Sequence, residues 1–260
     1  MSIDRRGLLR GMLACACCVK AGAAIASDAP AHGGAAAAHW SYDGEGGPDK
    51  WGELQADFKV CQLGLEQTPI DLGNGIKGDV GSVDYDYKPL PLRILNNGHT
   101  IQVNADAGSA CVIGGARYEL LQFHFHHPSE HLLAGKGFDL ECHLVHKSGA
   151  GALAVTGVFI RPGAANAALK TFFDSMPAKE GPEVRVDSAI DIGAILPKNG
   201  GYFRYMGSLT TPPCSEGLTW TIHQEPVEAS VEQIQKFASL FPNNARPVQR
   251  RNRRFLIDAS

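Results

Sequence analysis

Short runs that alternate hydrophobic and polar residues follow one another along most of the chain. These runs are rich in β-branched and aromatic residues, which favours strands, and turn signals such as Asn97-Gly98 and Lys147-Ser148-Gly149 separate them. After His39 no repeat, long linker or change in composition divides the chain. The pattern predicts one mainly β domain over residues 39–260.

Two segments have helical spacing instead. The first has apolar residues on one helical face: Leu169, Phe172, Phe173 and Met176. The second follows Ser230 and Gln233, which resemble a capping box, and its apolar residues are Ile234, Phe237 and Phe241. We expect both stripes to pack into the core.

The N-terminal segment has the pattern of an export signal over residues 1–26. Arg5, Arg6 and Arg10 precede an apolar run from Gly11 to Val19, and Ala24-Ile25-Ala26 supplies small residues for cleavage. The paired arginines fit a twin-arginine signal, and an ordinary secretory signal fits equally well. The apolar run is shorter than the roughly 20 residues that span a membrane.

Residues 27–38 are rich in alanine and glycine and predict a flexible linker. No later segment is long and apolar enough to cross a membrane. We therefore expect a periplasmic or secreted protein without a membrane span.

The overall composition is that of a globular domain, with 44% hydrophobic and 20% charged residues. The formal net charge of -3 provides no basic field for nucleic acid or anionic lipid. Small or neutral partners are favoured. Five arginines between Arg246 and Arg254 form a local basic cluster, which we interpret as a solvated face.

Removal of the signal leaves four cysteines, Cys61, Cys111, Cys142 and Cys214, in a protein bound for an oxidising compartment. Four cysteines allow three pairings, and their spacing does not choose among them.

Six of the ten histidines lie between His124 and His146, which indicates a metal site. Residues 120–126 alternate as a strand does, so Gln122, His124 and His126 share one face. Leu121, Phe123 and Phe125 take the other face, where they can pack into a core. Two imidazoles two residues apart on one strand can share a small cation.

Residues 140–146 alternate in the same way and place Glu141, His143 and Val145 on one face. A neighbouring strand would thus bring His143 to the pair. Three neutral imidazoles without a fourth protein ligand describe a catalytic zinc site. Gln122 and Glu141 lie on the ligand faces and could accept the outer N–H groups of His124 and His143. The remaining histidines of the cluster are interpreted as structural: His127, His131 and His146.

A metal site of another class is the alternative. His124-x-His126, Glu130 and Gly137 resemble the first metal motif of cupins, which often carry iron oxygenases. Tyr118 stands where cupins place an upstream glycine, and no second motif with Pro-x-Gly follows. The cupin match therefore fails at both ends.

An ordered set of motifs resembles the α-carbonic anhydrases from about His39 onward. Four carry most of the specificity: Gln122-Phe123-His124-Phe125-His126, Ser129-Glu130-His131, Glu141-Cys142-His143-Leu144-Val145-His146 and Gly207-Ser208-Leu209-Thr210-Thr211-Pro212-Pro213-Cys214. Five others match in order: His39-Trp40-Ser41-Tyr42, Gln67-Thr68-Pro69-Ile70, Asn96-Asn97-Gly98-His99, Trp220 and Asn244-Ala245-Arg246-Pro247. His127 stands where vertebrate members commonly have tryptophan.

The resemblance implies a single mainly β domain with a twisted, mostly antiparallel sheet of about ten strands and a few short helices. It also implies a zinc hydro-lyase that interconverts carbon dioxide and bicarbonate, with His124, His126 and His143 binding Zn²⁺ and zinc hydroxide attacking the substrate. The implied apolar wall for carbon dioxide is Val145, Val155, Leu209, Leu218 and Trp220, and Thr211 would contact bicarbonate.

Further roles follow from the same resemblance. Glu130 would accept the Thr210 hydroxyl proton, so that the Thr210 oxygen orients the nucleophile. His99 matches the proton shuttle, and Tyr42, Asn97 and Gln102 match residues that order water beside it. Weak ester hydrolysis would be a side reaction.

The resemblance also bears on stability, inhibitors and assembly. It implies a disulfide between Cys61 and Cys214, with Cys111 and Cys142 reduced, and inhibition by sulfonamides and anions. Exported bacterial relatives are often dimers, so a homodimer is one expected assembly. A non-catalytic zinc-binding relative is a further alternative, although such relatives typically lose a ligand histidine.

Overall fold

The computed structural model describes residues 39–260. The expected export signal (1–26) and linker (27–38) lie outside the described residues. Within 39–260, no helix has the length and hydrophobicity needed to cross a membrane.

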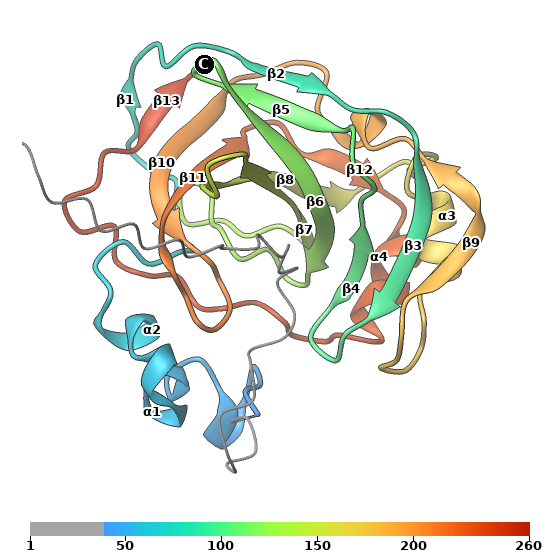
Figure 1. Cartoon of the computed structure of the whole chain (residues 1–260), viewed down its shortest axis with the longest axis horizontal. Coiled ribbons are helices and arrows are strands. Elements are labelled where there is room, and N and C mark those ends of the chain that lie inside the picture. The colour runs from blue at the N-terminus through green and yellow to red at the C-terminus, as the bar shows by residue number, and fades with distance from the viewer. Residues whose placement is uncertain (1–38) are drawn as a thin grey trace, which may run out of the picture. The chain divides into compact units, whose positions relative to one another are not determined.

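The described chain builds a 13-stranded sheet, and the main path through it has the order β1-β13-β10-β11-β8-β7-β6-β4-β3-β9 (Figure 1). The strands are β1 (Ile76–Lys77), β2 (Val83–Asp86), β3 (Leu90–Asn96), β4 (Ile101–Asn104), β5 (Ala110–Ile113), β6 (Ala116–His126), β7 (Leu140–Ser148), β8 (Leu153–Pro162), β9 (Val184–Ile190), β10 (Tyr202–Ser208), β11 (Glu216–His223), β12 (Val227–Ala229) and β13 (Ile257–Ala259). Most neighbours are antiparallel, while β1/β13, β8/β11 and β8/β12 are parallel. The predicted fold class is confirmed.

Helices are few and short, as expected. They are α1 (Trp51–Leu54), α2 (Val60–Leu63), α3 (Lys170–Ser175) and α4 (Val231–Ala238), with 3-10 turns at Gly44–Gly46, Ala56–Phe58 and Gly193–Ile195. Both sequence-predicted helices are present, and Ser230 and Gln233 form the capping box of α4. Their stripes pack with β6, because Phe172, Phe237 and Phe125 belong to one buried cluster.

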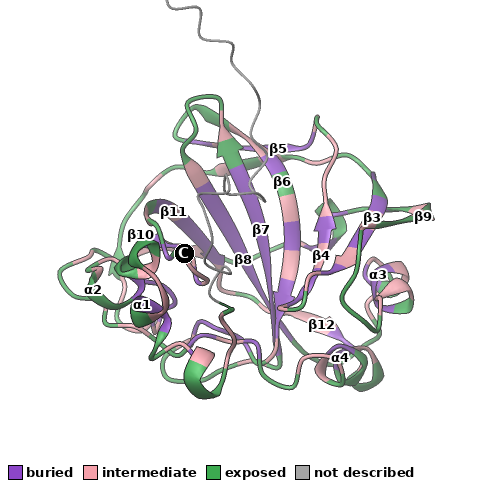
Figure 2. Cartoon of the chain, turned by 60° about the horizontal axis from the view of Figure 1, so that its bottom comes forward, coloured by how far each residue is buried: buried purple, intermediate pink, exposed green. Residues whose placement is uncertain are grey.

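The central strands separate two layers of core. Both β7 and β8 are buried along most of their length (Figure 2). Phe123, Phe125 and Leu144 lie in the cluster that contacts α3 and α4, whereas Val145 and Trp220 belong to a second cluster. Because side chains alternate along a strand, Leu144 of β7 faces the first cluster and its neighbour Val145 faces the second.

Leu121 departs from the expected face. It is 40% exposed rather than packed with Phe123 and Phe125. The register between β6 and β7 shifts here, because Leu120 pairs with His146 while Gln122 pairs with Val145. Leu121 is the extra residue of a β-bulge, and Leu120 takes the core position instead.

Candidate metal centre and active site

Two adjacent strands bring His124, His126 and His143 together. His124 is the direct cross-strand partner of His143 in the antiparallel β6/β7 pair, and His126 lies two residues further along β6. Ring centroids are 5.0 Å apart for His124 and His126, 5.4 Å for His124 and His143, and 4.6 Å for His126 and His143. One ring nitrogen of each lies within 4.8 Å of the others, so the three could hold one metal ion.

In each of these imidazoles one nitrogen is available to a metal, and the second nitrogen donates a hydrogen bond that orients the ring. His124 Nδ1 donates to Gln122 Oε1 (2.8 Å), and His143 Nε2 donates to Glu141 Oε1 (2.8 Å). His126 Nδ1 donates to the Asn244 carbonyl oxygen (2.7 Å). The nitrogens left free are Nε2 of His124, Nε2 of His126 and Nδ1 of His143. His126 Nε2 is buried and lacks a hydrogen-bond partner among the described residues.

The three rings are held as neutral bases. Burial lowers the pKa of His124 well below its ordinary value, and His126 and His143 lower it further. Burial likewise lowers the pKa of His126 to about 3 and lowers that of His143, although Glu141 acts in the opposite direction on His143. Metal binding needs the unprotonated nitrogen. This donor set therefore fits a divalent metal such as zinc.

Glu141 connects the cluster to a buried network that the sequence did not predict. Its Oε1 accepts from His131 Nδ1 (2.7 Å) as well as from His143, and its Oε2 accepts the backbone N–H groups of Glu130 and His131. His131 Nε2 and the Tyr205 hydroxyl are 2.6 Å apart. The neighbouring histidines lower the pKa of Glu141 well below its ordinary value, although burial alone would raise it.

Two other histidines point elsewhere. His146 is fully buried, and its Nε2 lies 2.7 Å from the Tyr87 hydroxyl. His127 Nδ1 donates to the Pro242 carbonyl oxygen (2.9 Å). Neither belongs to a group of side chains in the described chain that could hold a metal.

Glu130 is a buried carboxylate beside the histidines. Its Oε1 accepts the backbone N–H of Arg246 (2.9 Å) and lies 3.5 Å from His126 Nδ1. Burial raises the pKa of Glu130 well above its ordinary value, while the Arg246 N–H and the Thr210 hydroxyl act to lower it. Thr210 is itself buried, so a hydroxyl and a carboxylate adjoin the cluster away from bulk water.

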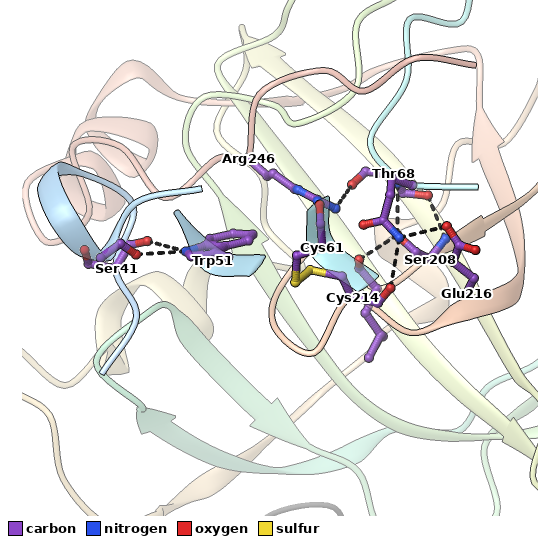
Figure 3. The surroundings of a disulfide bond; sticks show 11 residues. Ser41, Trp51, Cys61, Thr68, Ser208, Cys214, Glu216 and Arg246 are labelled. Atoms are coloured by element: carbon purple, nitrogen blue, oxygen red, sulfur yellow. Dashed lines mark hydrogen bonds between the residues drawn. A yellow bond between two sulfur atoms is a disulfide. The ribbon is translucent and has the colours of Figure 1, made fainter. Parts of the chain in front are cut away.

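The loop that carries Thr210 is anchored at both ends (Figure 3). Cys214 forms a disulfide with Cys61, as the resemblance implied, while Cys111 and Cys142 are free and buried. At the other end, Ser208 N–H donates to Thr68 Oγ1 (2.9 Å), and Thr68 N–H donates to Ser208 Oγ (2.9 Å). The loop is therefore tied to the segment from residue 61 to residue 68.

Arg246 joins the same segment to the Glu130 carboxylate. Its guanidinium donates to the carbonyl oxygens of Cys61 and Thr68 (both 2.8 Å), while its backbone N–H serves Glu130. Arg246 is only 2% exposed. The interpretation of the arginine cluster as a solvated face is therefore wrong for this residue, because its backbone N–H and both Nη atoms donate to acceptors inside the protein, while its Nε is buried without a partner among the described residues.

The apolar residues expected around the substrate lie together. Val145, Val155, Leu218 and Trp220 belong to one buried cluster, and half-buried Leu209 packs against it. The Trp220 ring centroid is 4.9 Å from that of His143, and Trp220 Nε1 donates to Ser208 O (3.0 Å). Thr211 is half-buried, and its carbonyl oxygen accepts from Cys214 N–H (2.9 Å).

His99 follows β3 and stacks on Trp40, with centroids 3.6 Å apart and planes inclined by 8°. The ring of exposed His39 is 6.1 Å away. Burial lowers the pKa of His99, His39 lowers it further, and Glu180 raises it. Asn97 Nδ2 donates to Gln102 Oε1 (3.3 Å), and Gln102 is the cross-strand partner of His124.

Tyr42 packs edge-on against Trp40, the residue on which His99 stacks. Burial raises the pKa of Tyr42 well above its ordinary value, and the charge of Glu130 raises it further. Tyr42, Asn97, His99 and Gln102 thus extend from the histidines toward exposed His39.

A model of the eukaryotic-type carbonic anhydrase family matches residues 46–258 of the chain. The chain belongs to the α-carbonic anhydrase family. This assignment confirms the resemblance found in the sequence and the enzyme class. It gives no support to the cupin alternative.

Relatives of the α-carbonic anhydrase family match most of the chain. A carbonic anhydrase of Nostoc sp. is 48% identical over 227 residues, which cover 85% of this chain and 86% of that protein. The α-carbonic anhydrase of Thermovibrio ammonificans in complex with sulfanilamide is 41% identical, with a TM-score of 0.83 over 85% of this chain and 99% of that one. A carbonic anhydrase of Chlamydomonas reinhardtii in complex with acetazolamide is 35% identical, with a TM-score of 0.75 over 85% and 99%.

Several residues that orient the candidate site were not predicted from the sequence. The Asn244 carbonyl oxygen accepts a hydrogen bond from His126, and Glu141 accepts from His131 as well as from His143. The backbone N–H of Arg246 donates to Glu130. The Asn244-Ala245-Arg246-Pro247 motif was the one available signal for Asn244 and Arg246.

Proposed function

We propose that this chain catalyses the reversible hydration of carbon dioxide to bicarbonate and a proton, with zinc bound by His124 Nε2, His126 Nε2 and His143 Nδ1. The observation that carries the proposal is the convergence of three neutral imidazole nitrogens. Each is left free because the second nitrogen of the same ring donates its proton to a protein oxygen. Three histidines without a fourth protein ligand are the donor set of a catalytic zinc site.

Zinc in such a site supplies a nucleophile at neutral pH by acidifying a coordinated water to a pKa of about 7, a value for which carbonic anhydrase is itself the standard example. The protein must then orient that nucleophile, hold carbon dioxide beside it and remove a proton.

Thr210 and Glu130 provide the orientation. An ionised carboxylate only accepts hydrogen bonds, and Glu130 Oε2 is buried without a hydrogen-bond partner among the described residues. The Thr210 hydroxyl, which acts on the Glu130 carboxyl, would donate to it, so that the Thr210 oxygen becomes an acceptor toward the histidines. A divalent cation nearby favours the ionised form of Glu130 against the effect of burial. Groups that can donate a proton to Thr210 Oγ1 are thereby selected over anions that cannot.

The apolar cluster beside His143 provides the site for carbon dioxide. The side chains of Val145, Val155, Leu209, Leu218 and Trp220 offer no strong acceptor or charge to the substrate. Since carbon dioxide is apolar, it loses little by leaving water for such a surface. Thr211 lies two residues after Leu209, which packs against this cluster, and would contact bicarbonate.

His99 provides the exit for the proton. The ordinary pKa of histidine, about 6.5, lies near 7, so an imidazole can both take up and release a proton at neutral pH. Burial and His39 lower the pKa of His99, which favours release of the proton to solvent. Tyr42, Asn97 and Gln102 would hold the water between His99 and the histidine cluster. Exposed His39 marks the solvent side of this path.

The Cys61–Cys214 disulfide supports an oxidising location, so we propose a periplasmic or secreted enzyme. Sulfonamides that appear in complexes of two related structures would inhibit this chain as well.

The proposal is tested by a stopped-flow assay of carbon dioxide hydration on the zinc-loaded protein, with acetazolamide as the control. We expect rapid hydration that acetazolamide abolishes and that His126→Ala lacks. Tight binding of one zinc without hydration would instead identify a non-catalytic zinc-binding member of the family.

A further inference from the structure

A row of hydrogen-bonded amide side chains leads away from the candidate active site and ends at a carboxylate. Asn97 Nδ2 donates to Gln102 Oε1 (3.3 Å), and Gln102 Nε2 donates to Asn104 Oδ1 (2.7 Å). Asn104 Nδ2 in turn donates to Glu183 Oε2 (2.8 Å). Glu183 directly precedes β9, the outer strand of the sheet path, so the row reaches the edge of the sheet (Figure 1).

The pairing of β4 with β6 places the inner part of this row beside the histidine cluster. Gln102 is the cross-strand partner of His124, and Asn104 is that of Gln122, which orients His124. Residues directly opposite each other on paired strands point to the same face of the sheet. Gln102 thus borders the cluster, whereas Glu183 can act on it only through the two amides between them.

Both ends of the row fix the direction of its hydrogen bonds. Asn97 Oδ1 accepts two backbone N–H groups of its own turn, at 3.0 and 2.9 Å, so the nitrogen of this amide is the atom that faces Gln102. At the other end an ionised carboxylate only accepts, so Asn104 presents its nitrogen to Glu183. The amide of Gln102 is consequently held in one orientation, with its oxygen toward Asn97.

Glu183 is held in its ionised form by an arginine. Arg93 Nε donates to Glu183 Oε1 (2.7 Å), so the two carboxylate oxygens serve different partners. The side chains of Arg93 and Glu183 are only 25% and 24% exposed, and the hydrogen bond from Arg93 lowers the pKa of Glu183. Asp106 also accepts from Arg93, through Nη1 (2.6 Å), but within residues 39–260 it has no hydrogen bond to the row. Of the two carboxylates on Arg93, only Glu183 touches the amides.

We propose that Glu183 is a positioning residue for proton transfer, because it fixes the amide of Gln102 and thereby the water beside His99. The inference rests on the proposed function, in which Gln102 helps to hold that water. Gln102 keeps one N–H and one oxygen lone pair for water, and the row decides toward which side each points. Loss of the Glu183 acceptor should therefore slow the removal of the proton and leave the attack on carbon dioxide unchanged.

The test measures carbon dioxide hydration by stopped flow in dilute buffer, on the zinc-loaded protein and its Glu183 variants. Glu183→Met keeps the length of the side chain and removes the carboxylate acceptor. We expect kcat to fall about fivefold at unchanged kcat/KM, because kcat/KM covers only the steps up to hydration. Imidazole buffer should restore the lost turnover, since an external proton carrier does not need the ordered water. Glu183→Gln keeps an oxygen for Asn104 and should recover most of kcat.

Asp106→Ala is the matched control, because it removes the other carboxylate partner of Arg93 without touching the row. It should keep the kcat of the parent protein. Asn104→Leu breaks the row one residue closer to Gln102, so it should show the same loss of kcat as Glu183→Met and the same rescue by imidazole.

The inference is overturned if Glu183→Met and Asn104→Leu keep the parent kcat, or if Asp106→Ala loses as much as they do. It is also overturned if kcat/KM falls together with kcat and imidazole restores nothing, because the change is then merely structural. These outcomes leave the proposed function standing. A parent protein that binds one zinc and hydrates no carbon dioxide would overturn the proposed function and this inference with it.

Discussion

The three candidate ligands differ from the other histidines in which ring nitrogen is free and where it points. Gln122, Asn244 and Glu141 each occupy one nitrogen and leave the opposite one directed at the same point. His146 lies on the same strand as His143, but three residues along an alternating strand it points to the opposite face. Strand parity, rather than proximity in sequence, therefore separates the three histidines that could hold a metal from His146.

Single alanine substitutions should distinguish the histidines that bind zinc from the histidines beside them. We expect His126→Ala to lose its zinc, while His127→Ala and His146→Ala keep about one equivalent after gel filtration, measured by elemental analysis. Loss of zinc in folded His146→Ala would refute the assignment by parity.

His146 should also make the stability of the protein depend on pH. Burial lowers its pKa to about 4 in the folded state, against about 6.5 when unfolded. Between these values the unfolded chain binds more protons, so stability falls as pH falls from about 6.5 to about 4. At pH 5 this one residue should cost about 2 kcal/mol relative to pH 7.

Urea unfolding of His146→Gln measures that contribution, because glutamine can keep the contact with the Tyr87 hydroxyl without titrating. The variant should lose about 2 kcal/mol less than the parent protein between pH 7 and pH 5. Equal losses in the two proteins would mean that His146 titrates as an exposed histidine does.

At the scale of strands and loops, the alternating pattern predicted which residues of β6 and β7 share a face, because side chains repeat every two residues whatever the tertiary context. The bulge at Leu121 escaped prediction, since one extra residue on one strand leaves no mark in its own sequence. Asn244 escaped for another reason. It lies 118 residues from His126 along the chain, so only the folded loop brings the two together.

The disulfide should stabilise the loop that carries Thr210 and the whole domain with it. Cys61 and Cys214 are 153 residues apart, and closing a loop of that length contributes about 5 kcal/mol in the chain-entropy model, an upper figure. We expect Cys61→Ser/Cys214→Ser to unfold at lower denaturant concentration, with the same spectrum when folded.

Cys111→Ser provides the comparison, because this buried thiol is free. The loss of stability caused by Cys111→Ser should be the same with and without a reducing agent. The parent protein should approach the stability of the double variant once its disulfide is reduced. Peptide mapping that joins Cys111 to Cys142 would contradict the pairing.

At the scale of the whole molecule, turnover requires a proton to travel from the buried histidines to solvent. A group of pKa about 7 releases its proton directly to water at only about 10^3 per second, given a diffusional rate constant of about 10^10 per molar per second. The fastest carbonic anhydrases turn over about 10^6 times per second. Turnover of that order would need a relay. His99 lies beside exposed His39 and two residues after Asn97, whose side chain donates to Gln102, the cross-strand partner of His124.

We expect His99→Ala to lower turnover in dilute buffer while its zinc content stays at one equivalent. Imidazole buffer should restore much of the loss, because it replaces the missing proton carrier. His127→Ala removes another histidine near the site. It should keep the turnover of the parent protein in dilute buffer and gain nothing from imidazole. Parent-like turnover of His99→Ala in dilute buffer would assign the relay to another group.

The hydrogen bonds that orient the three imidazoles also bear on the order in which the enzyme matures. All three acceptors belong to the protein itself, on β6, β7 and the segment that contains Asn244. The rings are consequently aligned by folding and not by the ion. Metal uptake is then a late, reversible step at a finished site, and a chelator should yield an apoenzyme that regains activity without refolding.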